Sequence, residues 1–402
     1  MAFLPRLEEI GMKAYPDEAR YHRERIAYFL GRGHGFPGAQ PVSFARRHFQ
    51  ELQRTDYYLC EKTDGIRCLL YLTTSPETGA ETHYLVDRKN DYYRLELHSL
   101  HFPLLENEQA FHTDTLVDGE LVCDRLPGGR SEIRYLVFDC MVRDGQNLTQ
   151  KPLDKRIGAF IYYVFEPYKT LLDKYPEELE HQAFTLTQKK FEKSYGTEMM
   201  FKDILPTLPH GNDGLVFTCR STPYVSGTDQ HIIKWKPPHE NTIDFRLEVG
   251  EFPILAEEEG GDSTHPDWEA TPNLALMVYH GEGKYEYYAE LHVTDDEWES
   301  MKALNAMIDG RIIECYQDSE HRWRFKREKD GSPRFRDDKT DANHISTVLS
   351  VIESIKDAVS EQDLIAAAGP INKAWKAREA EAARQAKEAE AVRRAPPPPK
   401  VQ

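Results

Sequence analysis

The sequence is poor in cysteine and has no long apolar run. Its 402 residues include six cysteines, none of which forms a CxxC pair. Most of them lie inside apolar, strand-like runs, where a cysteine usually acts as a small buried hydrophobe. No stretch approaches the ~20 apolar residues that span a bilayer, and the first residues lack the pattern of a secretory signal. We therefore expect no membrane association and a reducing compartment, the cytosol or the nucleus.

The 51 Lys/Arg residues are outnumbered by 68 Asp/Glu residues. The formal net charge is −17, which argues against a protein that coats nucleic acid non-specifically. Residues 371–402 carry eight Lys/Arg and four Asp/Glu, a net charge of +4 that leaves −21 for the remainder. A site that handles phosphate must then be a concentrated pocket and not a broad basic face.

The pattern of apolar residues predicts more than one domain. Hydrophobic residues make up 40% of the chain, enough for two or three cores. Between about residues 20 and 240, helical patterns are mixed with short β-rich runs that end at Gly, Asp or Asn. Beyond Pro237-Pro238 come five β-rich runs and one short helix. This second pattern predicts a partly closed barrel of the oligonucleotide/oligosaccharide-binding (OB) type.

We therefore expect an α+β protein with two domains. The first comprises residues 1–240, with antiparallel sheets and flanking helices, and the OB-fold barrel comprises residues 241–342, with a hinge near 237–241. Apolar spacing predicts a helix at about 343–360 with one buried stripe, which we expect to join the first domain. Residues 361–402 are expected to form a helical and Pro-rich tail that is partly disordered.

One lysine stands between two acids just before a glycine turn, in Glu61-Lys62-Thr63-Asp64-Gly65. An exposed lysine has a pKa near ~10.4, so its amine is mostly protonated and is no nucleophile. Neighbouring cations and partial desolvation lower the pKa of a lysine and free its amine. The motif is therefore either a solvated loop with an ordinary ion pair or a nucleophile at the floor of a pocket.

Further charged groups occur where other strand-like runs begin or end. Each is ordinary alone, as an acid at a turn or a lysine on an edge strand. Together they predict a polar site at one end of a set of strands. They are Tyr84-Leu85-Val86-Asp87-Arg88-Lys89-Asn90, Leu116-Val117-Asp118-Gly119-Glu120, Tyr135-Leu136-Val137-Phe138-Asp139, Asn212-Asp213-Gly214-Leu215-Val216-Phe217 and Ile232-Ile233-Lys234-Trp235-Lys236-Pro237.

In this order, the motifs resemble those of the covalent nucleotidyltransferases, the superfamily of mRNA capping guanylyltransferases and polynucleotide ligases. Asp87-Arg88-Lys89-Asn90 and Lys234-Trp235-Lys236-Pro237 look like the capping-enzyme versions. Arg334-Phe335-Arg336-Asp337-Asp338-Lys339 is similar to the element that ends the barrel domain of capping enzymes. The resemblance covers about residues 50–340 and is closest to the monofunctional, fungal-type guanylyltransferases. It implies that residues 1–240 are the nucleotidyltransferase domain.

The resemblance also implies a reaction and a site. Lys62 would attack the α-phosphorus of GTP to form a lysyl-N–GMP intermediate and release pyrophosphate. GMP would then pass to the 5′-diphosphate end of nascent mRNA and give a GpppN cap. The residues that the resemblance places at GTP or GMP are Arg67, Arg88, Glu120, Phe138 (stacked on guanine), Lys189 (a reader of guanine O6), Lys234, Lys236, Arg336, Asp338 and Lys339.

The resemblance further implies a divalent metal, Mg²⁺ or Mn²⁺, bound by Asp213 and Glu120, because carboxylate and phosphate oxygens are the ligands that Mg²⁺ prefers. Arg336, Asp338 and Lys339 lie on the barrel domain. The resemblance therefore implies that catalysis requires this domain to close over the departing pyrophosphate.

The implied partners are a 5′-diphosphate RNA end, a separate RNA 5′-triphosphatase subunit and the phosphorylated C-terminal domain of RNA polymerase II, in the nucleus. A separate triphosphatase is expected because no cysteine precedes Cys60 to form a His-Cys-x5-Arg phosphatase loop. Two alternatives stay open. An ATP-dependent polynucleotide ligase would adenylate the same lysine, and an inert scaffold docking on RNA polymerase would keep only the fold.

Overall fold

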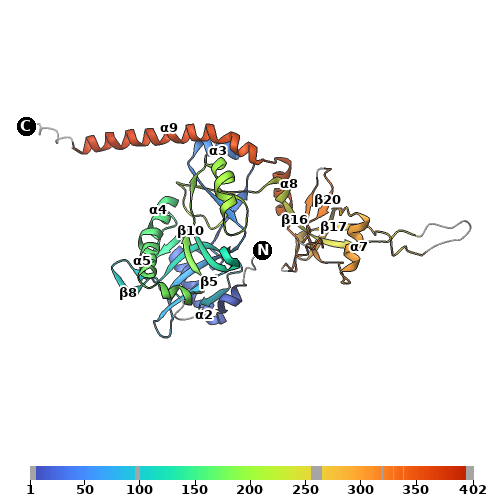
Figure 1. The fold of residues 1–402 in the computed structure, drawn as a ribbon, viewed down its shortest axis with the longest axis horizontal. Helices are drawn as coiled ribbons and strands as arrows, with labels where there is room; N and C mark the ends of the chain where they lie inside the picture. The colour runs from blue at the N-terminus through green and yellow to red at the C-terminus, as the bar shows by residue number, and fades with distance from the viewer. Residues whose placement is uncertain are drawn as a thin grey trace, which may run out of the picture. The chain divides into compact units, whose positions relative to one another are not determined.

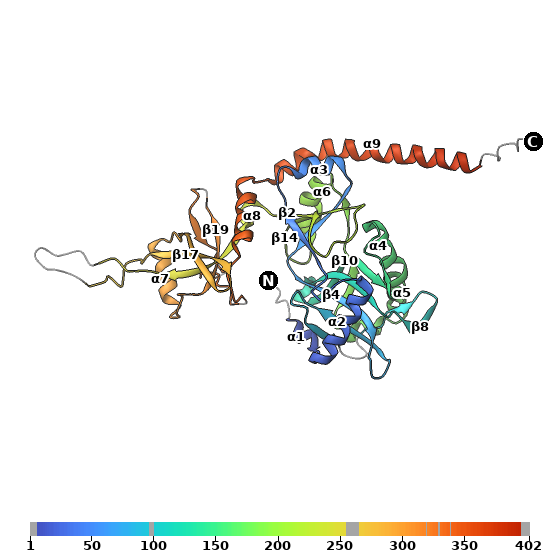
Figure 2. The same cartoon turned by 180° about the vertical axis from the view of Figure 1, so that it is seen from behind.

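The computed structural model describes residues 6–95, 100–254, 265–318, 320–328, 330–337 and 339–394. The chain is α+β, as expected, and divides into two compact units (Figures 1 and 2). The first unit is Met1–Trp235 with Glu361–Gln402, and the second is Lys236–Ser360. The boundary therefore falls a few residues before the expected one at 240. No helix in the described part of the chain is long and apolar enough to cross a membrane.

The first unit contains a large sheet whose strands run in the order β1-β6-β5-β4-β9-β10-β11. All pairs are antiparallel except that β12 adds to β10 in parallel. The strands are β1 (Gly11–Lys13), β4 (Ile66–Thr74), β5 (Glu81–Val86), β6 (Tyr92–Leu95), β9 (Thr115–Arg125), β10 (Ser131–Arg143), β11 (Gln146–Asn147) and β12 (Thr185–Gln188), with a separate ribbon of β7 (Pro103–Leu104) and β8 (Asn107–Phe111).

A smaller sheet in the same unit carries the lysine motif. Its order is β13-β3-β14-β15-β2, antiparallel except for the parallel pair of β15 and β2. The strands are β2 (Ala39–Ser43), β3 (Tyr57–Thr63), β13 (Glu192–Lys193), β14 (Asn212–Cys219) and β15 (Gly227–Trp235). The tight connection from β3 to β4, residues 64–65, leads from the smaller sheet directly into the large one.

Helices cover both faces of the large sheet because its side chains alternate between two cores. Leu70 and Leu72 face a core that includes residues of α4 and α5, whereas Leu69 and Tyr71 face a core with α2. The helices and turns of this unit are α1 (Leu7–Ile10), α2 (Pro16–Leu30), α3 (His48–Arg54), α4 (Leu153–Phe160), α5 (Glu166–Lys174), α6 (Thr197–Met199), the π turns Ile161–Phe165 and Met200–Ile204, and the 3₁₀ turns Pro127–Gly129, Pro176–His181 and Leu205–Thr207.

The second unit is the predicted five-stranded barrel. Its sheet has the order β18-β17-β16-β19-β20. Leu291, directly after β18, bridges to Trp323 of β20, so the two edge strands meet and partly close the sheet. The elements are the 3₁₀ turn Pro238–Glu240, β16 (Thr242–Val249), β17 (Leu274–Gly281), β18 (Lys284–Glu290), α7 (Asp295–Ala303), β19 (Ile312–Gln317), β20 (Trp323–Phe325) and α8 (Ile345–Lys356).

Two segments near the C-terminus differ from the expectation. The predicted helix at about 343–360 forms as α8, but Val348 and its apolar neighbours pack into the barrel core, so the helix belongs to the second unit. The following residues form α9 (Glu361–Arg394), which returns to the first unit beside α3 and α6 (Figures 1 and 2). Trp375 of α9 is buried against Tyr58 and Tyr195, so the helical part of the tail is docked over this stretch. The predicted Pro-rich end lies outside the described residues.

Candidate active site

Lys62 lies at the end of β3, beside the start of β14. Its ammonium donates a hydrogen bond to Asp213 Oδ1 at 2.7 Å. The two side chains are 25% and 22% exposed, so the pair is partly buried and still open to a ligand. The β3–β14 ladder shifts its register between Asn212 and Leu215, which is where Asp213 projects. The structure thus brings the predicted nucleophile and the predicted metal-binding acid together.

Glu120 holds the turn that follows Lys62. Its carboxylate accepts hydrogen bonds from the Thr63 hydroxyl and from the Gly65 N–H, the second at 3.2 Å. The turn leaves no room for a side chain, because a Cβ at Gly65 would lie 2.3 Å from the carbonyl oxygen of Leu121. Both carboxylate oxygens of Glu120 are therefore engaged in shaping the loop beside Lys62.

Arg67, near the start of β4, is held by Asp118 of β9. Its Nε and Nη2 donate to the two oxygens of Asp118 at 3.1 and 2.6 Å, and its Nη1 donates to the carbonyl of Ala39. Burial alone would lower the pKa of Arg67, but the charge of Asp118 outweighs that effect and the pKa is raised. The guanidinium is thus a fixed positive charge, and it lies 5.5 Å from the ring centre of Phe138.

Phe138 sits where the pairing of β9 with β10 changes register, between Val137 and Asp139. Such a bulge redirects a side chain out of the regular strand pattern. The ring is partly buried, and two cations lie close to it, because the Arg67 guanidinium is 5.5 Å and the Lys189 ammonium 5.9 Å from its centre. A flat ring beside fixed donors is suited to holding a heteroaromatic base.

Lys189 is almost fully buried. Its ammonium donates to the Thr63 hydroxyl at 2.9 Å and lies 3.7 Å from the carboxylate of Glu61. Burial lowers the pKa of Lys189, but the nearby negative charges, including Glu61 and Glu120, outweigh it, so the pKa is raised. The sequence places Lys189 far from the lysine motif, and the structure joins it directly to Thr63.

The remaining predicted residues that precede the barrel are Arg88, Lys234 and Lys236. Arg88 is exposed in the turn that joins β5 to β6, two residues past the last β4–β5 pair, Leu69 with Val86. Lys234 is partly buried on β15, where it pairs with Val216 of β14. Lys236 is the first residue of the second unit.

The predicted residues of the second unit surround an acid that the sequence does not single out. Arg336 lies 3.2 Å from Asp244 Oδ2, and the Lys339 ammonium also donates to this carboxylate. Asp338, predicted with them, lies outside the described residues. Asp244 is buried at the start of β16 and is the anchor for this element.

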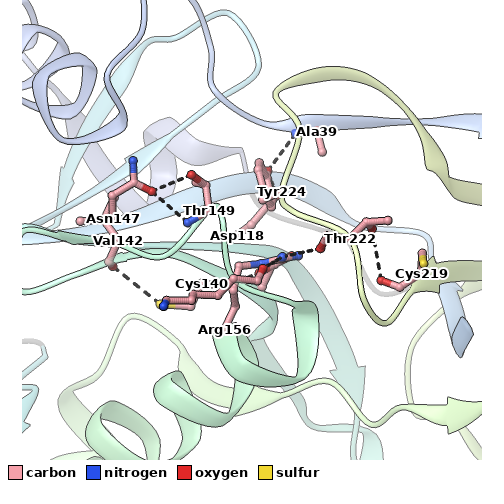
Figure 3. Close-up of polar contacts among 12 residues, drawn as sticks. Ala39, Asp118, Cys140, Val142, Asn147, Thr149, Arg156, Cys219, Thr222 and Tyr224 are labelled. Atoms are coloured by element: carbon pink, nitrogen blue, oxygen red, sulfur yellow. Dashed lines mark hydrogen bonds and ion pairs between the residues drawn. The ribbon is translucent and has the colours of Figure 1, made fainter. Parts of the chain in front are cut away.

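Several residues that shape the site are missed by sequence reasoning. They are Glu61, Thr63, Asp118, His210 and Tyr224, all of which lie in polar contact with predicted site residues or with each other. Asp118 stands in the same motif as Glu120, and a charged residue inside an apolar run is the signal that marks it. Tyr224 has no such signal, since it reaches Asp118 only through the fold (Figure 3).

The residues present can be tested against a divalent cation. Within the described ranges, no three His, Cys, Asp or Glu side chains are grouped as a protein-only metal site. Mg²⁺ commonly binds one or two carboxylates and completes its shell with water and substrate phosphates. Partly exposed Asp213 fits that role, whereas Glu120 is already committed to Thr63 and Gly65.

Comparison with known proteins gives consistent matches over most of the chain. The family model for the mRNA capping enzyme catalytic domain matches residues 7–238, and the model for the mRNA capping enzyme C-terminal domain matches residues 240–365. The mRNA-capping enzyme subunit alpha of Neurospora crassa is 51% identical over 92% of this chain and 93% of the relative.

The corresponding subunits of Schizosaccharomyces pombe and Saccharomyces cerevisiae are 45% and 36% identical. The matches cover 89% of this chain and 87% of the S. pombe relative, and 87% of this chain and 82% of the S. cerevisiae relative. The predicted family and enzyme class, nucleotidyltransferase, are thereby confirmed. The chain belongs to the mRNA capping enzyme family.

Proposed function

We propose that the protein is an mRNA guanylyltransferase that works through Lys62. The Lys62 amine attacks the α-phosphorus of GTP, a P–N bond forms, the bond to the β-phosphate breaks, and pyrophosphate leaves. A terminal oxygen of a 5′-diphosphate RNA end then attacks the same phosphorus. The P–N bond breaks, the lysine regains its proton, and the product carries a GpppN cap.

The placement of Lys62 carries this proposal. Its ammonium lies at a strand end, partly exposed, with one carboxylate at 2.7 Å and a glycine turn beside it. Only a neutral amine can attack phosphorus, so the amine must give up the proton that it shares with Asp213. The Asp213 carboxylate is placed to accept that proton before it takes up the divalent cation. Around this pair, Arg67 and Lys189 supply fixed positive charge next to Phe138.

The residues divide by the part of GTP that they suit. Phe138 offers a ring face for guanine, and Lys189 offers an N–H donor of the kind that guanine O6 accepts. Arg67, Arg88, Lys234 and Lys236 suit the ribose and phosphate oxygens, because phosphoryl transfer is accelerated mainly by positioning and charge neutralisation.

Glu120, for which the sequence also predicts a ribose contact, acts first on the turn next to Lys62. For the leaving pyrophosphate we propose Arg336, Asp338 and Lys339.

We infer that the required divalent cation is Mg²⁺ or Mn²⁺, held by Asp213 together with phosphate oxygens. When bound, it supplies charge neutralisation on the triphosphate. The side-chain contacts of Glu120 favour a role in shaping the loop over direct metal binding.

The name of the relatives, subunit alpha, supports a separate partner subunit, which we propose to be the RNA 5′-triphosphatase. We also propose the phosphorylated C-terminal domain of RNA polymerase II as a partner and the nucleus as the compartment.

The proposal is tested by incubating the protein with α-labelled GTP or ATP and Mg²⁺ and separating it on a denaturing gel. We expect a covalent label from GTP that is lost in Lys62→Ala. Lys13→Ala is the matched control, because the Lys13 ammonium also lies 2.7 Å from a carboxylate, that of Asp91, but on the surface. A label from ATP alone would instead indicate a ligase, and no label from either nucleotide would indicate an inert scaffold.

A further inference from the structure

We propose that Tyr224 is a positioning residue for nucleotide binding, which sets Arg67 through Asp118. This inference rests on the proposed function, in which Arg67 contacts GTP. It adds a residue that lies outside the recognisable motifs, on the connection between β14 and β15.

Tyr224 is buried, and its hydroxyl and its backbone N–H are both hydrogen-bonded. Its hydroxyl donates to Asp118 Oδ2 and accepts from the N–H of Ala39 at 2.8 Å, and its own N–H donates to the carbonyl of Thr149 at 2.7 Å. Figure 3 shows the ring lying between Ala39 and Asp118. Burial, and next the negative charge of Asp118, raise the pKa of Tyr224 well above its ordinary value, so the hydroxyl stays a donor.

Asp118 is the point through which Tyr224 acts on Arg67. Its side chain is fully buried, and Oδ2 accepts from both Tyr224 and Arg67 Nη2. A buried carboxylate needs several donors to keep its charge and its orientation. Without the hydroxyl, Asp118 loses a neutral donor that fixes the rotation of its carboxylate. The two hydrogen bonds from Arg67 would then no longer be held in one direction.

Arg67 and Tyr224 are both hydrogen-bonded to the same two residues, Asp118 and Ala39. Tyr224 accepts from the N–H of Ala39, and Arg67 donates to the carbonyl of Ala39. Of the five guanidinium N–H groups, three point to Asp118 and Ala39, and no further acceptor of Arg67 occurs among the described residues. Two N–H groups are thus left for a ligand, on a side chain that is 20% exposed beside Phe138.

The connection that carries Tyr224 also links the two sheets of the first unit. It joins β14, which carries Asp213, to β15, which carries Lys234, whereas Asp118 and Arg67 lie in the large sheet. Arg156 secures the same connection. It donates to the carbonyl of Thr222 at 3.0 Å (Figure 3). It is also paired with Asp139 at 2.7 Å. Tyr224 therefore couples the strands that carry Lys62 and its partners to the guanidinium that meets the nucleotide.

The test is the rate of Lys62–GMP formation as a function of GTP concentration. We expect Tyr224→Phe to raise the half-saturating GTP concentration about tenfold, because a hydrogen bond to a charged group is lost, while the maximal rate changes little. The control is Tyr168→Phe, which removes another buried hydroxyl, bonded to Gln182 away from the site, and leaves both values unchanged.

A double-mutant cycle separates positioning from general stability. In an Arg67→Ala background, Tyr224→Phe should have almost no further effect on half-saturation, because its effect passes through Arg67. The proposal would be overturned if Tyr224→Phe raised the half-saturating GTP concentration in the Arg67→Ala background as much as it does alone. It would also be overturned if Tyr224→Phe alone left that concentration unchanged. If Tyr224→Phe does not fold, Asp118→Asn removes the carboxylate that joins Tyr224 to Arg67. The same two results for the half-saturating GTP concentration would then overturn the proposal.

The proposed function and this inference fail in different ways. If Arg67→Ala leaves half-saturation unchanged, the assignment of Arg67 to GTP is wrong and the role of Tyr224 falls with it. If Arg67→Ala raises half-saturation and Tyr224→Phe does not, only the positioning role is wrong.

Discussion

The Lys62 ammonium donates to Asp213 Oδ1 at 2.7 Å, across the β3–β14 ladder. The pair joins the proposed nucleophile to a predicted metal-binding acid. We propose that Asp213 first takes the proton of Lys62 and then holds the divalent cation together with the phosphates.

Asp213→Asn should lower the rate of Lys62–GMP formation about 100-fold, because an amide neither accepts the lysine proton nor holds a divalent cation well. The measurement is the single-turnover labelling rate at several Mg²⁺ and Mn²⁺ concentrations. The matched control is Asp91→Asn, because the Asp91 carboxylate pairs with Lys13 on the surface at the same distance, 2.7 Å. A labelling rate in Asp213→Asn equal to that of the control would contradict the assignment.

Gly65→Ala should displace the turn after Lys62, since the added Cβ would lie 2.3 Å from the backbone oxygen of Leu121. We expect the free energy of unfolding to fall by about 1–3 kcal/mol, the range for overpacked sites, together with a loss of labelling. Gly158→Ala is the control, because a Cβ at that helical glycine meets no atom within 4 Å. Chemical denaturation measures the stability of both variants. An equal loss in the free energy of unfolding for the two would argue against a constrained turn at Gly65.

Lys189→Met should weaken the preference for GTP over ATP about tenfold, because the variant removes a buried donor that lies 3.7 Å from the Glu61 carboxylate. The measurement is competition between the two nucleotides in the labelling reaction. Lys190→Met serves as the control, since Lys190 is the exposed neighbour in sequence. A preference that stays the same in Lys189→Met would remove Lys189 from base recognition.

His210 should make stability depend on pH. Its Nδ1 lies 2.7 Å from Asp124 and its Nε2 lies 3.9 Å from Glu61. Burial lowers the pKa of His210, but these two carboxylates outweigh it, so the folded-state pKa is raised above 6.5. The contribution to stability is therefore complete below about pH 6.5 and is lost as the pH rises through the folded-state pKa.

The free energy of unfolding, measured between pH 5.5 and 8.5 by urea denaturation, checks this prediction for His210. The difference between the wild-type protein and His210→Gln should be largest at the acidic end and should shrink towards the alkaline end. A difference that grows with pH would mean that the imidazole is buried in its neutral form.

Local sequence patterns predicted the barrel strands and singled out Lys62 as the candidate nucleophile, a role that stays a prediction. The five barrel strands follow from alternating apolar residues between turns, and Lys62 follows from its glycine turn and the charged strand ends around it. What these patterns could not supply is the pairing of residues far apart in the chain. Asp118 and Arg67, or Lys189 and Thr63, come together only when the sheets form.

The two differences from the expected fold have the same origin. The apolar stripe of α8 predicts a buried face but does not say which core covers it, and Val348 proves to lie in the barrel. Likewise, the Ala/Glu/Lys/Arg-rich composition of α9 suggests an exposed helix, but Leu364, Ile371 and Trp375 in its first half are buried. In both cases a long-range packing partner, and not the local pattern, decides the outcome.

The most direct measurement is tandem mass spectrometry of the protein after incubation with GTP and Mg²⁺, read at conditions that preserve acid-labile P–N bonds. The account predicts one GMP adduct, located on Lys62, that disappears when 5′-diphosphate RNA is added. An adduct on Lys189 or Lys234, or an AMP adduct formed from ATP in preference to GMP, would contradict it.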